Sequence, residues 1–175
     1  MSNSENYSLK DIAIMYRDHF VHKVAIIHVK DKMTPIKIRF DQGHLAHLIG
    51  LHKFDYKRGE QLYHSLLEGK ITWDDLKRRN MGSYRQYEYR MKYIIYLKDV
   101  IDSCRIAVYD GMIRADLMLY DEKGKRFLSL GIHKEKTTDF FVPTTFIENK
   151  YNKFQRNRHI VVVSREMQSI DEYTQ

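Results

Sequence analysis

The spacing of apolar residues changes from a helical to an extended period at Cys104, and this change most limits the possible folds. Before Cys104, apolar side chains recur every three or four residues, as at Tyr84, Tyr87 and Met91, which is typical of amphipathic helices. After Cys104 they fall in short β-branched runs separated by tight polar links, which is typical of strands. Consecutive strands with short links pair antiparallel, because a parallel pair needs a long crossover. The sequence therefore predicts an α+β fold with helices first and a small antiparallel sheet after them.

Capping signals predict where the helices begin. Ser8 with Asp11, and Thr72 with Asp75, have the spacing of capping boxes. Ser83 has the same spacing to Gln86 and predicts a long helix over residues 83–103. The segments predicted as strands are residues 24–29 and 36–40, which form a hairpin, and then 106–109, 113–120, 127–132, 140–142 and 160–163.

Length and composition indicate one domain. The chain has 175 residues and 43% hydrophobic residues, enough to bury an ordinary core. We expect a disordered N-terminus at residues 1–7, one domain at 8–166 and a C-terminal tail at 167–175. No apolar run approaches the ~18 residues of a membrane helix, and the N-terminus does not read as a signal peptide. The sequence therefore predicts a cytoplasmic protein without membrane contact.

Cys104 is the only cysteine, which excludes a disulfide framework and a thiolate metal cluster. It precedes an apolar run, so we expect a buried, unreactive thiol. No cofactor is expected.

The charge is strongly positive and unevenly distributed. The formal net charge is +7 and the isoelectric point is about 9.3, which suits a nucleic acid, an anionic membrane or an acidic protein. Residues 77–98 contain seven basic residues and one acidic residue, and residues 148–165 contain five basic residues and one acidic residue. Two basic zones suggest two walls of one site, with RNA as the expected polyanion.

A histidine cluster follows Asp41 and can carry acid–base chemistry. His44 and His47 are three residues apart and would share a helix face, with His52 and Lys53 close behind. Imidazoles can move protons, and a lysine can neutralise a phosphate. RNA supplies its own nucleophile, the 2′-hydroxyl, so cleavage needs no metal. Two alternatives stay open: histidines that only pack on the helix beneath, and a zinc site from His44 and His47.

Two further groups of residues could bind RNA. Thr144 and Thr145, at a predicted strand end after Pro143, could direct hydroxyls at a phosphate, although threonine is also a favoured strand residue. On the long helix, cations alternate with rings that can stack on bases, although a solvated helix face has the same pattern. The residues of this stripe are Arg85, Tyr89, Lys92 and Tyr96, and the cations and amide expected to grip the strand after Thr145 are Gln155, Arg156 and Arg158.

Three short motifs resemble a family of nucleases found on phages and mobile elements. They are His47-Leu-Ile-Gly-Leu51, Pro143-Thr-Thr-Phe146 and the later Gln155. The family is the phage-associated barnase, EndoU, colicin and RelE-like (BECR) nucleases, specifically the fourth group. The resemblance covers roughly residues 9–165 and implies helices ahead of a small antiparallel sheet and a metal-independent ribonuclease.

The resemblance also implies roles for single residues. His47 matches the histidine of the His-Leu-x-Gly motif and would act as general base or acid. Thr145 matches the polar residue of Pro-x-Thr-Phe and would position the scissile phosphate, and Gln155 matches the later glutamine. The residues added from chemistry alone are His44, Lys53, Lys134 and Arg156.

The sequence thus predicts a metal-independent endoribonuclease, acting as a toxin or as a phage or mobile-element effector. Such a toxin implies an acidic antitoxin or immunity protein that covers the basic surface. The alternative is a non-catalytic protein that binds nucleic acid or blocks a host factor, because charge and tyrosines fit a binder equally well.

Overall fold

The computed structural model describes residues 7–54 and 59–173, which form two compact units. The helical unit contains the residues up to Val21 and Asp41–Ile95, and the sheet unit contains His22–Phe40 and the residues from Tyr96 onward. Neither unit is a continuous stretch of chain. The predicted disordered segment lies outside the described residues except for Tyr7, and the prediction of one domain stays a prediction.

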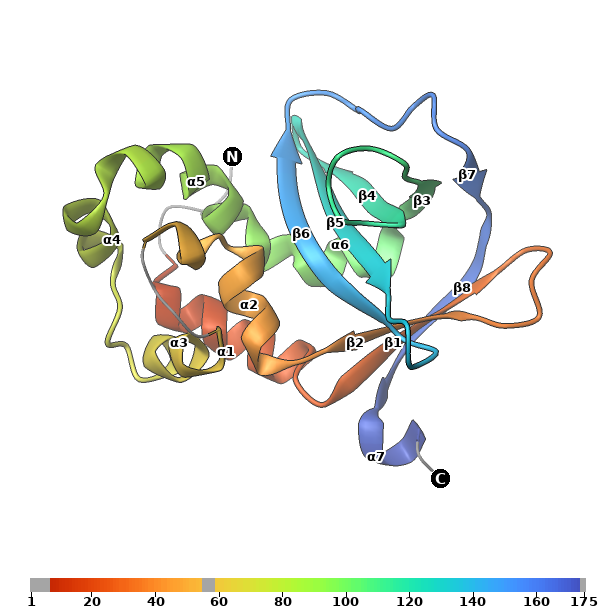
Figure 1. Cartoon of the computed structure of the whole chain (residues 1–175), viewed down its shortest axis with the longest axis horizontal. Coiled ribbons are helices and arrows are strands. Elements are labelled where there is room, and N and C mark those ends of the chain that lie inside the picture. Colours follow the sequence, from red (N-terminus) through yellow and green to blue (C-terminus); the bar gives the residue numbers. More distant parts are fainter. Residues whose placement is uncertain (1–6, 55–58, 174–175) are drawn as a thin grey trace. The chain divides into compact units, whose positions relative to one another are not determined.

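Capping interactions set the helices of the helical unit. The Ser8 main-chain N–H donates to Asp11 Oδ2 at 2.9 Å, and the Asp11 N–H donates to Ser8 Oγ at 3.0 Å, which confirms the predicted capping box. Thr72 and Asp75 make the same exchange. Each box satisfies amides that a helix leaves without partners at its first turn. The helices are α1 (Leu9–His19), α2 (Gln42–Leu48), η1 (Leu51–Phe54), α3 (Gly59–Leu67), α4 (Trp73–Arg79) and α5 (Met81–Tyr93) (Figure 1).

The long helix predicted over residues 83–103 is wrong in two respects. Asn80 rather than Ser83 caps α5, because the Asn80 side chain accepts a hydrogen bond from the Ser83 N–H at 3.0 Å. The helix is also interrupted by the 3₁₀ helix η2 (Ile94–Tyr96), after which α6 (Leu97–Ser103) belongs to the sheet unit. The interruption begins with two β-branched residues in succession, which crowd a helix.

The strands form one eight-stranded sheet in the order β7-β3-β4-β5-β6-β2-β1-β8. The predicted hairpin of β1 with β2 and the predicted meander from β3 to β6 are confirmed. β2 and β6 pair parallel, at Ile38 and Phe141. The strand bounds are β1 (Lys23–Val29), β2 (Ile36–Phe40), β3 (Arg105–Val108), β4 (Leu117–Lys123), β5 (Arg126–Lys134), β6 (Phe141–Asn149), β7 (His159–Ile160) and β8 (Val162–Ser169), and the short helix α7 (Ile170–Tyr173) follows.

The two edge strands are consecutive in the sequence, and this closes the sheet. Only Val161 separates β7 from β8, although these strands occupy opposite ends of the strand order. The sheet must therefore curl until its edges nearly meet, and it is barrel-like (Figure 1). The prediction of a small antiparallel sheet is wrong, because local apolar alternation does not reveal that β8 pairs with β1. Residues 167–169, predicted as tail, belong to β8.

Both faces of the meander are buried. On one face, register places Leu119 opposite Leu130 and Leu130 opposite Phe146, and all three are fully buried. On the other face, a cluster forms around Tyr120 and Phe154. Cys104 is buried as predicted, and burial raises the pKa of its thiol.

Gly131, on β5, packs closely against both neighbouring strands and lies opposite Thr145 and Met118. A Cβ at Gly131 would lie 2.7 Å from Thr145 Cγ2 and 3.2 Å from Met118 Sδ. We expect Gly131→Ala to lower the free energy of unfolding by about 1–3 kcal/mol through overpacking, measured by urea denaturation. The control is Gly82→Ala in the exposed first turn of α5, which should not destabilise because alanine favours a helix over glycine. Unchanged stability of Gly131→Ala would contradict this packing.

Candidate active site

The turn after α2 brings two histidines together in the helical unit. Gly50 has a φ of 81°, which favours glycine, and a Cβ there would lie 2.7 Å from Cδ1 of the Tyr87 ring. This turn leads directly into η1, whose ends Leu51 and Phe54 are buried. His47 and His52, on either side of Gly50, are exposed and stacked, with ring centroids 4.9 Å apart and an interplanar angle of 21°.

The charges around His52 favour its neutral form. Partial burial lowers the pKa of His52, and the positive charges of His47, Lys53 and Arg90 lower it further. A neutral imidazole at a pH where an ordinary histidine is charged can accept a proton. His52 therefore has the electrostatics of a general base beside His47.

Arg90, on α5, anchors the C-terminal end of α2. Its Nε donates to the Leu48 carbonyl, and its Nη2 donates to the His47 carbonyl at 3.3 Å. Both carbonyls are in the last turn of α2, where a helix lacks donors of its own, and the His47 carbonyl also accepts from the Gly50 main-chain N–H at 3.1 Å. Burial lowers the pKa of Arg90 to about 10, so the guanidinium keeps its charge at neutral pH. Arg90 is thus a positioning residue for the main chain of His47.

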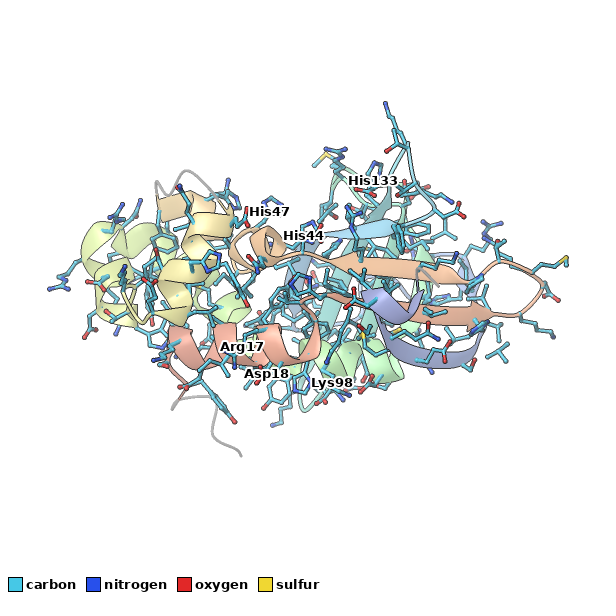
Figure 2. The ribbon with its side chains drawn as sticks, turned by 90° about the horizontal axis from the view of Figure 1, so that it is seen from below. Arg17, Asp18, His44, His47, Lys98 and His133 are labelled. Atoms are coloured by element: carbon cyan, nitrogen blue, oxygen red, sulfur yellow. The ribbon has the colours of Figure 1, made fainter. Side chains whose placement is uncertain are left out.

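His44 and Lys53 flank the stacked pair in the sequence. His44 and His47 both lie on α2 (Figure 2). The Asp41 main-chain N–H donates to Nδ1 of His44 at 3.0 Å, so this ring nitrogen caps the start of α2. A neutral His44 therefore carries its proton on Nε2. Lys53 is exposed, and its carbonyl accepts a hydrogen bond from Ser83 Oγ at 3.2 Å.

The stripe predicted along α5 and the basic zone around it are partly neutralised. Arg85 and Tyr89 are exposed, whereas Lys92 Nζ lies 2.7 Å from Glu88 Oε1, a contact that lowers the pKa of Glu88. Other cations of residues 77–98 are paired with acidic side chains in the same way, namely Lys77, Arg78 and Lys98. Four of the seven basic residues in this zone thus have carboxylate partners, which weakens it as a surface for a polyanion.

Thr145 lies inside the sheet unit rather than on its surface. The whole motif from Pro143 to Phe146 is within β6, not at a strand end as predicted. Thr145 is only 8% exposed and lies opposite Gly131, whose carbonyl accepts a hydrogen bond from Thr144 Oγ1 at 3.1 Å. The Thr144 hydroxyl is therefore held by β5, and Thr145 packs against Gly131.

Lys134 ends β5 beside a histidine and a carboxylate. Asp116 Oδ2 lies 2.9 Å from His133 Nδ1 and accepts the Lys134 main-chain N–H at 2.6 Å. The Lys134 ammonium is exposed and lies 3.7 Å from Asp139 Oδ1. His133, visible on β5 in Figure 2, has a charge partner that sequence reasoning did not assign.

Gln155, Arg156 and Arg158 lie on the connection from β6 to β7, and all three are exposed. Gln155 and Arg156 line a hollow of about 440 Å³ together with Tyr151, Asn152 and Lys153. The connection thus offers amide, cationic and aromatic groups to a ligand.

The predicted site residues divide between the two units. The helical unit holds His44, His47, Lys53, Arg85, Tyr89 and Lys92, and the sheet unit holds Lys134, Thr145, Gln155, Arg156 and Arg158. Within the helical unit, the structure adds His52 and Arg90, which sequence reasoning left without a role. Gly50 was the sequence signal that could have placed His52 beside His47, because a glycine with positive φ reverses the chain between the two histidines. No sequence signal connected Arg90 to α2.

A family model matches nearly the whole chain. It describes the phage-Barnase-EndoU-ColicinE5/D-RelE like nuclease4 and matches residues 8–175. The match places the protein among the nucleases. The chain belongs to the PBECR4 family, as the short motifs around His47, Thr145 and Gln155 had suggested. No curated protein and no solved structure matches it.

Two features are absent from the described part of the chain. None of its helices has the length and apolar character needed to cross a membrane. In the same residues, no group of three or more histidine, cysteine, aspartate or glutamate side chains is placed to hold a metal ion.

Arg90→Lys tests the anchoring of α2. A lysine cannot donate to two carbonyls in the fixed geometry of a guanidinium, so we expect the free energy of unfolding to fall by about 1–3 kcal/mol, measured by chemical denaturation. Arg85→Lys, an exposed position on the same helix, should change it by less than about 0.5 kcal/mol. Equal effects at the two positions would contradict the assigned role of Arg90.

Proposed function

We propose that this protein is a metal-independent endoribonuclease that cuts RNA through attack of the 2′-hydroxyl. The observation that carries the proposal is the stacked pair of His47 and His52 in a chain of a nuclease family. Two imidazoles side by side supply the base and the acid that this reaction needs. RNA, rather than DNA, is the substrate because the nucleophile belongs to the ribose.

The reaction has two linked proton transfers. His52 takes the proton of the 2′-hydroxyl as the oxygen attacks the phosphorus, and His47 gives a proton to the 5′-oxygen that leaves. One P–O bond forms and one breaks, and the products are a 2′,3′-cyclic phosphate and a free 5′-hydroxyl. Lys53, exposed beside the pair, stabilises the charge that develops on the phosphate. His44 assists by holding the start of α2 through Nδ1.

The sheet unit contributes binding of the substrate. Gln155, Arg156 and Arg158 are exposed and suited to grip phosphates, and Lys134 adds a further ammonium. By the family resemblance, Thr145 would position the scissile phosphate; its side chain is only 8% exposed.

A toxin or phage effector is the setting that fits such an enzyme. A nuclease that cuts cellular RNA harms its host cell, so a toxin requires a partner that blocks it. An acidic antitoxin or immunity protein would be drawn to a chain with a net charge of +7.

The first test is cleavage by purified protein. Wild type and His47→Ala are incubated with total cellular RNA in EDTA, and fragment ends are typed after a denaturing gel. We expect fragments ending in 2′,3′-cyclic phosphate from wild type and none from His47→Ala, whose expression should also leave growth unimpaired. The matched control is His64→Ala, an exposed histidine on α3, which should cleave as wild type does.

Three outcomes would count against the proposal. Cleavage by His47→Ala at the wild-type rate would remove His47 from the reaction. Cleavage of 2′-deoxy substrates would contradict the assignment of the 2′-hydroxyl as the nucleophile. Intact RNA with both proteins, together with a shift on a native gel, would favour a non-catalytic nucleic-acid-binding protein.

The pH dependence tests the role of His52. Its lowered pKa keeps the imidazole neutral below the ordinary histidine value of 6.5, so the acidic limb of kcat/KM should lie below that value if His52 is the base. Lys53→Gln removes a neighbouring positive charge and should move this limb to higher pH. The measurement is kcat/KM on a short RNA over about pH 4 to 8. An acidic limb at or above the ordinary histidine value would contradict the assignment.

A further inference from the structure

One segment of the sheet unit gathers several cations that have no carboxylate partner among the described residues. Residues 149–165 contain no acidic residue. Lys150, Lys153, Arg156 and Arg158 are exposed, and within the described residues none of them forms an ion pair with a carboxylate. This contrasts with residues 77–98, where four cations are paired. A polyanion binds most strongly where the cations have no carboxylate partner that competes for them.

This segment ends at a histidine that is held by a buried tyrosine. His159, the first residue of β7, is exposed, whereas Tyr120 on β4 is only 1% exposed. The Tyr120 hydroxyl and Nε2 of His159 share a hydrogen bond of 2.6 Å. The Tyr120 ring is itself fixed by Phe154, with centroids 5.4 Å apart. The imidazole is therefore oriented by the core of the sheet unit.

Arg105 places a cation at the same point. Strand pairing sets Arg105 opposite Tyr120 and Ala107 opposite His159, so Arg105, Tyr120 and His159 share one face of the sheet. The Arg105 guanidinium lies 5.1 Å from the centroid of the Tyr120 ring, and the side chain is exposed. An imidazole and a guanidinium thus flank one buried phenol, and none of these three residues belongs to the proposed catalytic pair.

We infer that Arg105, Tyr120 and His159 form a phosphate-binding site for single-stranded RNA. The inference rests on the proposed function and adds where the sheet unit holds the strand. Arg105 and His159 bind one phosphate, and Tyr120 is the positioning residue that orients the imidazole. When the Tyr120 hydroxyl donates to Nε2, the His159 proton is on Nδ1, where it can be donated to a phosphate oxygen.

The neighbouring segment extends the site to a base. Tyr151 is 64% exposed, and Lys153 Nζ lies 5.8 Å from its ring centroid. An exposed ring beside cations is the arrangement on which unpaired bases stack. The hollow lined by Tyr151 and Arg156 lies along the same connection that leads to His159. The strand would therefore follow residues 150–159.

Binding of a ligand that cannot be cleaved tests the site. The probe is a fluorescent single-stranded 2′-O-methyl RNA, and affinity is measured by anisotropy at several salt concentrations. We expect His159→Ala and Arg105→Gln each to weaken binding about tenfold. Arg105→Gln should also reduce the slope of log affinity against log salt by about 0.7, the contribution of one phosphate contact to a single strand. Tyr120→Phe should weaken binding without changing this slope.

The matched control is His28→Ala, an exposed histidine on β1 whose Nε2 lies 3.7 Å from Glu166, and it should bind as wild type does. Wild-type affinity in both His159→Ala and Arg105→Gln overturns the site, as does a wild type that does not bind the probe. If His159→Ala fails to fold, the affinity of the Arg105→Gln variant, which changes an exposed side chain, decides whether the site exists. A wild type that binds through these residues but leaves total RNA intact keeps the site and refutes the proposed cleavage.

Discussion

The single residue between β7 and β8 governs the architecture of the sheet unit. Val161 joins strands that lie at opposite ends of the strand order, so the sheet closes on itself or one of its edge pairings is lost. This short link brings the two edge strands close to each other. It also fixes β7 against β3, and this pairing places the imidazole of His159 within reach of the Tyr120 hydroxyl. The one-residue link between β7 and β8 thus connects the strand order of the sheet to the contact between His159 and Tyr120.

Whether a basic side chain of this protein is available to a polyanion depends on its neighbours in space more than on the count of charges along the sequence. Four of the seven basic residues in residues 77–98 lie within one helical turn of acidic residues and pair with them, as Lys92 does with Glu88. The connection between β6 and β7 contains no acidic residue, and the nearby Glu148 is paired with Arg126, so the cations of the connection stay available. A count of charges along the sequence made the two zones similar, whereas the structure makes the second the stronger surface for a polyanion.

Local signals in the sequence predicted local structure well. The capping boxes at Ser8 and Thr72, the first hairpin and the meander all depend on residues close in sequence, and all are present. The pairing of β8 with β1 was missed because the partners are more than a hundred residues apart. The break at η2 was missed although its two successive β-branched residues are a local signal. For the candidate site, a family motif and the chemistry of imidazole indicated His47. The contacts of His52 and Arg90 needed the fold, since each partner lies across a turn or on another helix.

Two histidines of this protein are anchored in different ways, one through its main chain and one through its ring. The two anchors suit different chemical roles. His47 is anchored through its main-chain carbonyl by Arg90, an interaction that uses no ring nitrogen. His159 is anchored through Nε2 of its ring by Tyr120, which fixes the ring and leaves Nδ1 as the donor when the Tyr120 hydroxyl donates to Nε2. A general acid must change its protonation during each turnover, so anchoring through the main chain is the better arrangement for catalysis. A binding group needs a fixed donor and no proton exchange, so anchoring through the ring is better for holding a phosphate. Under the proposed function, the two anchors suit proton transfer at His47 and retention of the RNA strand at His159.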